Sequence, residues 1–118
     1  MLTVNEDTTH PATVTVALDA CGGNVMLSLR DVDGVKFRQA LNAADAAAVF
    51  GVCHAYSDKV KVCEGDLMVV RRDGGLMFEW SSDGDFGVVP LRAGHLVVFE
   101  EALKSYCRLL MRSPEERP

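Results

Sequence analysis

The chain of 118 residues carries a formal net charge of −5, and 48% of its residues are hydrophobic and 25% charged. This is the composition of one globular domain, long enough to bury a core without disulfides or metals. The apolar runs are far shorter than a bilayer span, and residues 1–11 lack the basic start and apolar centre of a secretory signal. We therefore expect a cytoplasmic protein with no membrane association, in which residues 1–118 form a single domain.

The first half of the chain predicts three strands. Residues 12–19 and 25–29 alternate apolar and polar side chains, as half-buried strands do, and glycines lie between the two segments. The Asp-Gly pair at 33–34 favours a tight hairpin turn, because these residues accept positive φ angles. The turn leads into a third alternating segment over 35–39, in which Lys36 and Arg38 share one face.

A change of period then predicts a helix. Asn42 is a favourable N-cap, and Asp45 lies where an acid stabilises a helix N-terminus. The alanines that follow have high helix propensity. Apolar residues recur at the spacing of one helix face, at Val49, Val52, Cys53 and Tyr56. We expect this helix to end near Ser57.

The second half repeats the pattern. Alternating segments predict strands over 59–63, 66–72, 76–81 and 87–91. Pro90 indicates an edge strand or a strand end, because proline cannot donate to a central ladder. The last helix presents one apolar stripe, made of Leu96, Phe99, Leu103, Tyr106, Cys107 and Leu110. Residues 113–118 are mostly polar and predict a flexible tail.

The two halves match at their turn glycines, one strand face and the helix stripe. Val25, Leu27 and Leu29 match Leu76, Phe78 and Trp80; Val35, Phe37 and Arg38 match Val89, Leu91 and Arg92; and Val49, Val52, Cys53 and Tyr56 match Leu103, Tyr106, Cys107 and Leu110. The offset grows from about 51 to 54 residues, which a longer hairpin in the second copy would explain. Either a duplication or the patterning common to any two such units accounts for the match.

A small sheet and an amphipathic helix cannot bury their apolar faces alone, so the two halves must pack together. The sequence therefore predicts an α+β fold in one domain. Two pseudo-symmetric β-β-β(-β)-α repeats, over approximately 12–58 and 59–112, form antiparallel sheets and two helices.

The cysteines and histidines show no ligand spacing. Cys21, Cys53, Cys63 and Cys107 are widely scattered without a CxxC pair, and His10, His54 and His95 do not group with them. Cys53 and Cys107 fall on helix faces, where a thiol acts as a small hydrophobe, so we expect free thiols and no metal. No nucleophile-elbow or phosphate-loop motif is present, and we expect no cofactor and a non-enzymatic protein.

Basic residues on the predicted strands are the candidates for binding nucleic acid or a partner protein. They are Arg30, Lys36, Arg38, Lys59, Lys61, Arg71, Arg72 and Arg92. Single-stranded nucleic-acid binders combine such charges with exposed aromatic rings. Phe37, Phe78 and Trp80 are expected to face the core instead, and a row of strand charges also serves as an ordinary solvated face.

The order of elements resembles a known group of folds. Strand-rich segments followed by a helix, repeated in one short chain, are similar to the Whirly, Pur and PC4-like single-stranded nucleic-acid-binding proteins. The segment Phe78-Glu79-Trp80, followed by Phe86 and a last helix, is similar to the Tyr-Asp-Trp stretch of plant Whirly proteins. The resemblance implies a Whirly-like fold. The Lys-Gly-Lys-Ala-Ala segment with which Whirly proteins contact DNA has no counterpart in this sequence.

Two functions follow from these observations. The acidic balance and the missing basic segment favour a protein-interaction or regulatory module, whereas the strand-borne cations favour single-stranded nucleic-acid binding. A homodimer is also expected, because the edge strands suggested by Pro90 and residues 59–63 are open to pairing.

Overall fold

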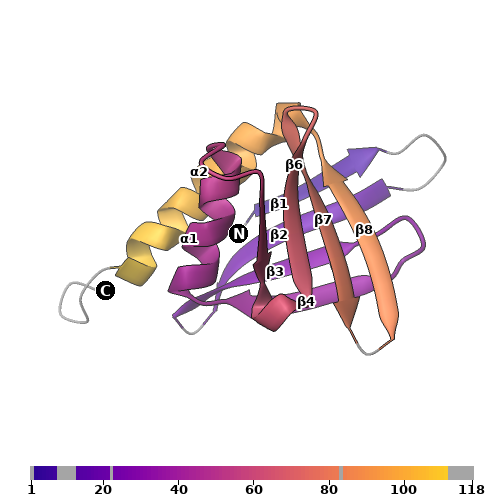
Figure 1. Ribbon diagram of the computed structural model, residues 1–118, viewed down its shortest axis with the longest axis horizontal. Coiled ribbons are helices and arrows are strands. Elements are labelled where there is room, and N and C mark those ends of the chain that lie inside the picture. The colour runs from indigo at the N-terminus through magenta and orange to yellow at the C-terminus, as the bar shows by residue number, and fades with distance from the viewer. Residues whose placement is uncertain (1, 8–12, 22, 83, 112–118) are drawn as a thin grey trace.

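The computed structural model describes residues 2–7, 13–21, 23–82 and 84–111. Two four-stranded antiparallel sheets, each followed by a helix, make up the molecule (Figure 1), which confirms the α+β fold of two repeats. In chain order the elements are β1 (Leu2–Asp7), β2 (Thr13–Cys21), β3 (Asn24–Arg30), β4 (Lys36–Leu41), α1 (Ala43–Cys53), β5 (Lys59–Val62), a 3-10 turn (Cys63–Gly65), β6 (Leu67–Arg72), β7 (Gly75–Ser82), β8 (Asp85–Leu91) and α2 (Ala93–Met111).

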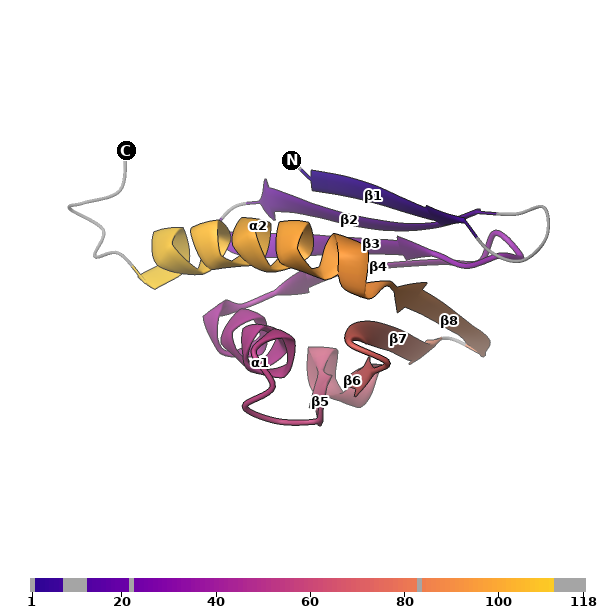
Figure 2. The same cartoon turned by 90° about the horizontal axis from the view of Figure 1, so that it is seen from above.

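The two sheets and the helices form layers around one core. The first sheet has the order β1-β2-β3-β4 and the second β5-β6-β7-β8. Figure 2 shows the first sheet as one layer. Helices α1 and α2 and the second sheet all lie on the same side of it. β5 and β8 are edge strands of the second sheet, as the sequence predicted. The predicted tail over 113–118 lies outside the described residues.

Strand β1 was not predicted from the sequence. It pairs antiparallel with β2, with Val4 opposite Val16, and Val4 is buried. The first repeat therefore begins before the boundary that we drew at residue 12, and each repeat has four strands. Leu2 and Val4 are the only two apolar residues in this strand, too few for a period-two pattern.

The strand registers correct the alignment of the two repeats. Val25 pairs with Leu41 in the first repeat, and Leu76 pairs with Leu91 in the second, so Leu41 rather than Phe37 corresponds to Leu91. The offset thus falls from 51 to 50 instead of rising to 54. The reason is that the β7–β8 hairpin of the second repeat is shorter than the β3–β4 hairpin of the first, and not longer as expected.

Helix α1 begins as predicted and ends earlier. Asn42 is its N-cap, and its side-chain oxygen accepts a hydrogen bond from the Asp45 amide at 2.8 Å. The helix ends at Cys53, because Ala55 adopts a positive φ of 62° and the Tyr56 amide donates to the Gly51 carbonyl. Tyr56, which we placed on the apolar face, is 82% exposed beyond the helix end.

The core joins the two sheets through aromatic rings. Phe37, Phe78 and Trp80 are buried, as predicted. The ring of Trp80 lies 5.7 Å from that of Phe37 in the first sheet, and Phe78 packs edge-on against Phe99 of α2 at the same centroid distance. Trp80 is paired across the strands with Gly87, and a Cβ atom at Gly87 would overlap the indole ring. The sheet can hold this large side chain because its neighbour has none.

Replacing Gly87 by alanine tests this packing. We expect Gly87→Ala to lower the free energy of unfolding by about 1–3 kcal/mol, because the added methyl group displaces the indole ring. Urea denaturation followed by far-ultraviolet circular dichroism measures the change. Gly51→Ala in α1 is the matched control, since a Cβ there meets no atom within 4 Å and alanine favours helix. Equal stability of Gly87→Ala and the unsubstituted protein would contradict the proposed packing.

Candidate functional site: the outer faces of the two sheets

The outer face of the first sheet is polar. Alternate residues of each strand point into the core, so the remaining residues point outward. Neighbours across the strands form outward rows: Asn5, Thr15, Arg30 and Lys36 in one, Thr3, Ala17, Ser28 and Arg38 in a second, and Asp19, Met26 and Ala40 in a third. The Thr15 hydroxyl donates to the Asn5 side-chain oxygen at 3.1 Å.

Three cations cluster at one side of this face. Arg30 lies directly opposite Lys36, and Arg38 follows two residues along β4. All three are exposed, and in the described part of the chain none has a carboxylate within 4.0 Å. Like charges directly opposite each other on a sheet are unfavourable, so this arrangement lowers stability unless an anion joins it.

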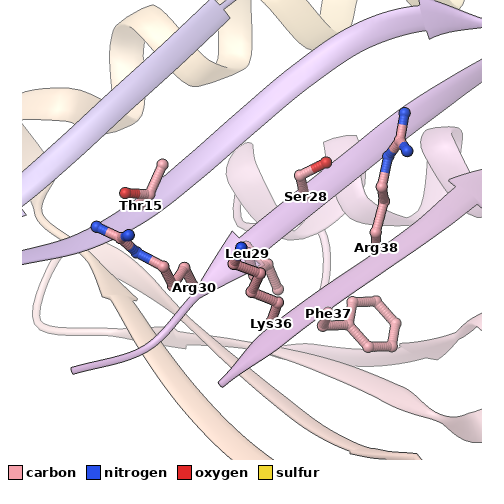
Figure 3. A pocket seen from close by; sticks show the side chains of 7 residues that line it. All are labelled: Thr15, Ser28, Leu29, Arg30, Lys36, Phe37 and Arg38. Atoms are coloured by element: carbon pink, nitrogen blue, oxygen red, sulfur yellow. The ribbon is translucent and has the colours of Figure 1, made fainter. Parts of the chain in front are cut away.

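The cations border a shallow hollow of about 410 Å³ (Figure 3). Its lining comes from three adjacent strands: Thr15, Ser28, Leu29, Arg30, Lys36, Phe37 and Arg38. Thr15 and Ser28 have short side chains, and the longer side chains of the three cations lie beside them (Figure 3). The face can therefore offer hydroxyl and cationic donors to a ligand that carries negative charge.

The acid that precedes the hairpin turn is already engaged. Asp31 is 6% exposed, and its Oδ1 accepts hydrogen bonds from the amides of Asp33 and Val35 at 3.0 and 2.9 Å. This arrangement holds the turn that brings Lys36 opposite Arg30. The Asp-rich segment therefore has a structural role, as the turn prediction implied.

The other predicted basic residues lie elsewhere. Lys59 and Lys61 are on β5 in the second sheet, Arg72 ends β6, and Arg92 follows β8. Since the inner faces of the two sheets meet in one core, their outer faces point in opposite directions (Figure 2). The eight candidates therefore do not form one contiguous patch.

Arg71 points inward and serves the fold. Its Nη1 donates to the carbonyl oxygens of Cys53 at 2.8 Å and Val52 at 3.3 Å, at the end of α1. A guanidinium there satisfies carbonyls that have no partner within the helix and complements the helix dipole. We therefore leave Arg71 out of the candidate binding surface. Its alternation with Val70 and Arg72 along β6 could have placed it on the inner face from the sequence.

The outer face of the second sheet is mainly apolar, with Glu79 half-buried on β7 and Lys59 and Lys61 exposed on β5, which the sequence did not predict. Its residues are half-buried at Met68, Val70, Met77, Val88 and Pro90, and Phe86 is 68% exposed. These strands are apolar on both faces, so the pattern did not separate the core side from the outer side. This face is opposite in character to the outer face of the first sheet.

Two of the thiols in the described residues are buried. Cys53 and Cys63 are buried free cysteines, and Cys107 is a half-buried one. Burial, with a smaller contribution from the Glu100 carboxylate, raises the pKa of the Cys53 thiol from 9.0 to about 12, and burial raises the pKa of Cys63 to about 11. Glu100 also links the helices, since its carboxylate lies 2.7 Å from Nε2 of His54.

These pKa values predict a loss of stability in alkali. Below pH 9 both folded and unfolded chains keep the Cys53 proton, whereas between pH 9 and about 12 only the unfolded chain loses it. The stability from this group is therefore fully present below pH 9 and falls above it. Urea denaturation between pH 8 and pH 11 should show the stability gap between the unsubstituted protein and Cys53→Ala narrowing. Lysine and tyrosine titrate in both proteins, so their effect cancels in the difference. A stability difference that stays constant from pH 8 to pH 11 would refute the raised pKa of Cys53.

Within the described ranges, no three or more His, Cys, Asp or Glu side chains are grouped to hold a metal ion. In that same part of the chain, no helix has the length and apolarity to cross a bilayer.

Comparison with known proteins identifies the fold alone. No protein-family model and no curated protein matches the sequence. Solved structures do match, among them trypanosome MRP1/MRP2 with a TM-score of 0.70 and 10% sequence identity. That match covers 89% of this chain and 81% of the trypanosome chain. The arrangement of two sheets and two helices is therefore one that occurs in a solved protein of very different sequence.

Proposed function

We propose that this protein binds the phosphate backbone of single-stranded nucleic acid on the outer face of the first sheet. The observation that carries the proposal is the cluster of Arg30, Lys36 and Arg38, in which like charges face each other and no carboxylate of the described residues pairs with them. Phosphate groups supply the missing negative charge. The Whirly-like arrangement inferred from the sequence supports the same ligand class.

The chemistry of the surface favours phosphate contacts over base recognition. Among the described residues, the outward rows of the first sheet contain no aromatic ring on which a base could stack. Hydroxyls of Thr15 and Ser28 and the three cations can all donate to phosphate oxygens. Such binding is independent of sequence and weakens steeply with salt.

The protein-interaction function that net charge favoured rests on a different surface, the apolar outer face of the second sheet. The two functions do not compete for residues. A net charge of −5 does not argue against the basic face, because the charges are segregated on the folded molecule.

Fluorescence anisotropy with a labelled oligonucleotide of about 20 nucleotides tests the proposal. We expect binding at about 20 mM salt, with log K falling against log salt at a slope near −2, since three phosphate contacts contribute about −0.7 each. The double variant Lys36→Ala, Arg38→Ala should weaken binding at least tenfold and reduce the slope to about −0.7.

The matched control removes two cations from the opposite face. Lys59→Ala, Lys61→Ala changes the net charge by the same amount and should leave both affinity and slope nearly unchanged. No binding at low salt, or equal weakening by both double variants, would refute the assignment of this surface.

A further inference from the structure

The outer face of the second sheet differs from its counterpart in a way that folding does not require. Both sheets have the same strand order and bury one face in the common core. The first sheet shows that a polar outer face is compatible with this fold. In the second sheet, the counterpart of the row Thr3, Ala17, Ser28 and Arg38 reads Lys61, Met68, Glu79 and Val88, and the next outward row reads Lys59, Val70, Met77 and Pro90.

One exposed aromatic ring lies beyond these rows. Phe86 lies opposite Ser81 on β8, two residues from Val88 on the same face, and 68% of its surface is exposed. An exposed phenyl ring at the border of a face that carries methionine, valine and proline side chains is typical of protein interaction sites. Methionine in particular adapts its shape to a partner.

The size of this face decides what can cover it. Four strands at about 4.8 Å spacing and three rows about 6.7 Å apart span roughly 20 by 20 Å, or about 400 Å². A stable interface between two globular proteins needs about 800 Å² on each side, so face-to-face pairing of two copies would be too small. A single helix of about 13 residues, which is about 20 Å long and 10 Å wide, fits across it.

The other side of the same sheet already packs against a helix. There the apolar stripe of α2 contacts β7, with Phe99 against Phe78. The strands of this sheet are therefore long enough to pack against a helix stripe.

The charges at the border define the partner's chemistry. Lys59 and Lys61 are exposed on β5, each at one end of an outward row, and Glu79 lies two strands away in the row of Lys61. Among the described residues neither lysine has a carboxylate within 4.0 Å. Their Cα atoms are about 6.7 Å apart along the strand. Carboxylates four residues apart on a helix have nearly the same separation, about 5–6 Å. A helix with two acids along one side of its apolar stripe would meet both lysines.

We propose that the outer face of the second sheet is a docking site for an amphipathic helix of another protein, with an apolar stripe and carboxylates bordering it. The apolar stripe covers Met68, Val70, Met77 and Val88, and the carboxylates pair with Lys59 and Lys61. The site does not depend on nucleic-acid binding, since it lies on the opposite side of the molecule.

Selection from a displayed library of random 16-residue peptides against the full chain tests the proposal. Enriched sequences should place apolar residues at helical spacing with Asp or Glu four residues apart, and a synthesised peptide should gain helicity on binding. Phe86→Ala, which removes an exposed ring and so leaves the core intact, should weaken this peptide at least fivefold. Met77→Glu and the pair Lys59→Glu, Lys61→Glu should each weaken it at least tenfold.

Matched variants distinguish helix docking on this face from peptide binding elsewhere on the molecule. Met77→Leu should bind like the unsubstituted protein, and Lys36→Ala, Arg38→Ala should not affect the peptide, whatever its effect on oligonucleotides. Exchanging the acids of the peptide for lysines should abolish binding. Enrichment of no peptide, of basic peptides, or of peptides insensitive to Phe86→Ala overturns the proposal. Light scattering that shows a dimer dissociated by Met77→Glu overturns it in favour of a second copy as the occupant.

Discussion

The packing of Trp80 over Gly87 and against Phe37 joins the two sheets, and the other elements are arranged around it. A domain of this length has a single core, so the sheets gain stability only by burying the same aromatic rings from both sides. Trp80 is large enough to extend from the second sheet to the first because Gly87 leaves room beside it. The helices then cover the inner surface that remains, with Phe99 against Phe78. Most inner positions of the described strands are buried in this way, and their outward positions remain exposed or half-buried.

Local patterns predicted the parts of the fold that depend on neighbours in sequence. Alternation gave the strands of both repeats, and the side chain of Asn42 caps α1 as expected. Strand β1 was not predicted because it is stabilised by its pairing with β2. Residues 2–7 alone do not show which segment they pair with. The predicted end of α1 was wrong because the helix is terminated by Ala55 in the left-handed conformation. Glycine usually takes this conformation at a helix end, and the sequence has no glycine there.

The candidate surfaces could be predicted only in part, for a similar reason. Alternation placed Lys36 and Arg38 on one face correctly, but which sheet each cation belongs to depends on the strand order. Alternation along β6 was enough to place Arg71 on the inner face, but its hydrogen bond to the end of α1 is a contact that no spacing in the sequence encodes. Net charge was the least informative feature, because it sums over faces that point in opposite directions. The balance of −5 coexists with a cluster of three cations at one side of a sheet face, whose acid Asp19 lies in another row.

The exchange of side-chain size between the repeats has a consequence for their symmetry. In matched registers, Leu29 of the first repeat corresponds to Trp80 of the second, and Phe37 corresponds to Gly87. The first repeat thus carries its ring on the outermost strand of its sheet, and the second carries it one strand further in. Two copies of the first repeat would lack the indole that spans the core, and two copies of the second would place two indoles where one fits. The halves are therefore not interchangeable, because each supplies to the common core a ring at a position where the other has a smaller side chain.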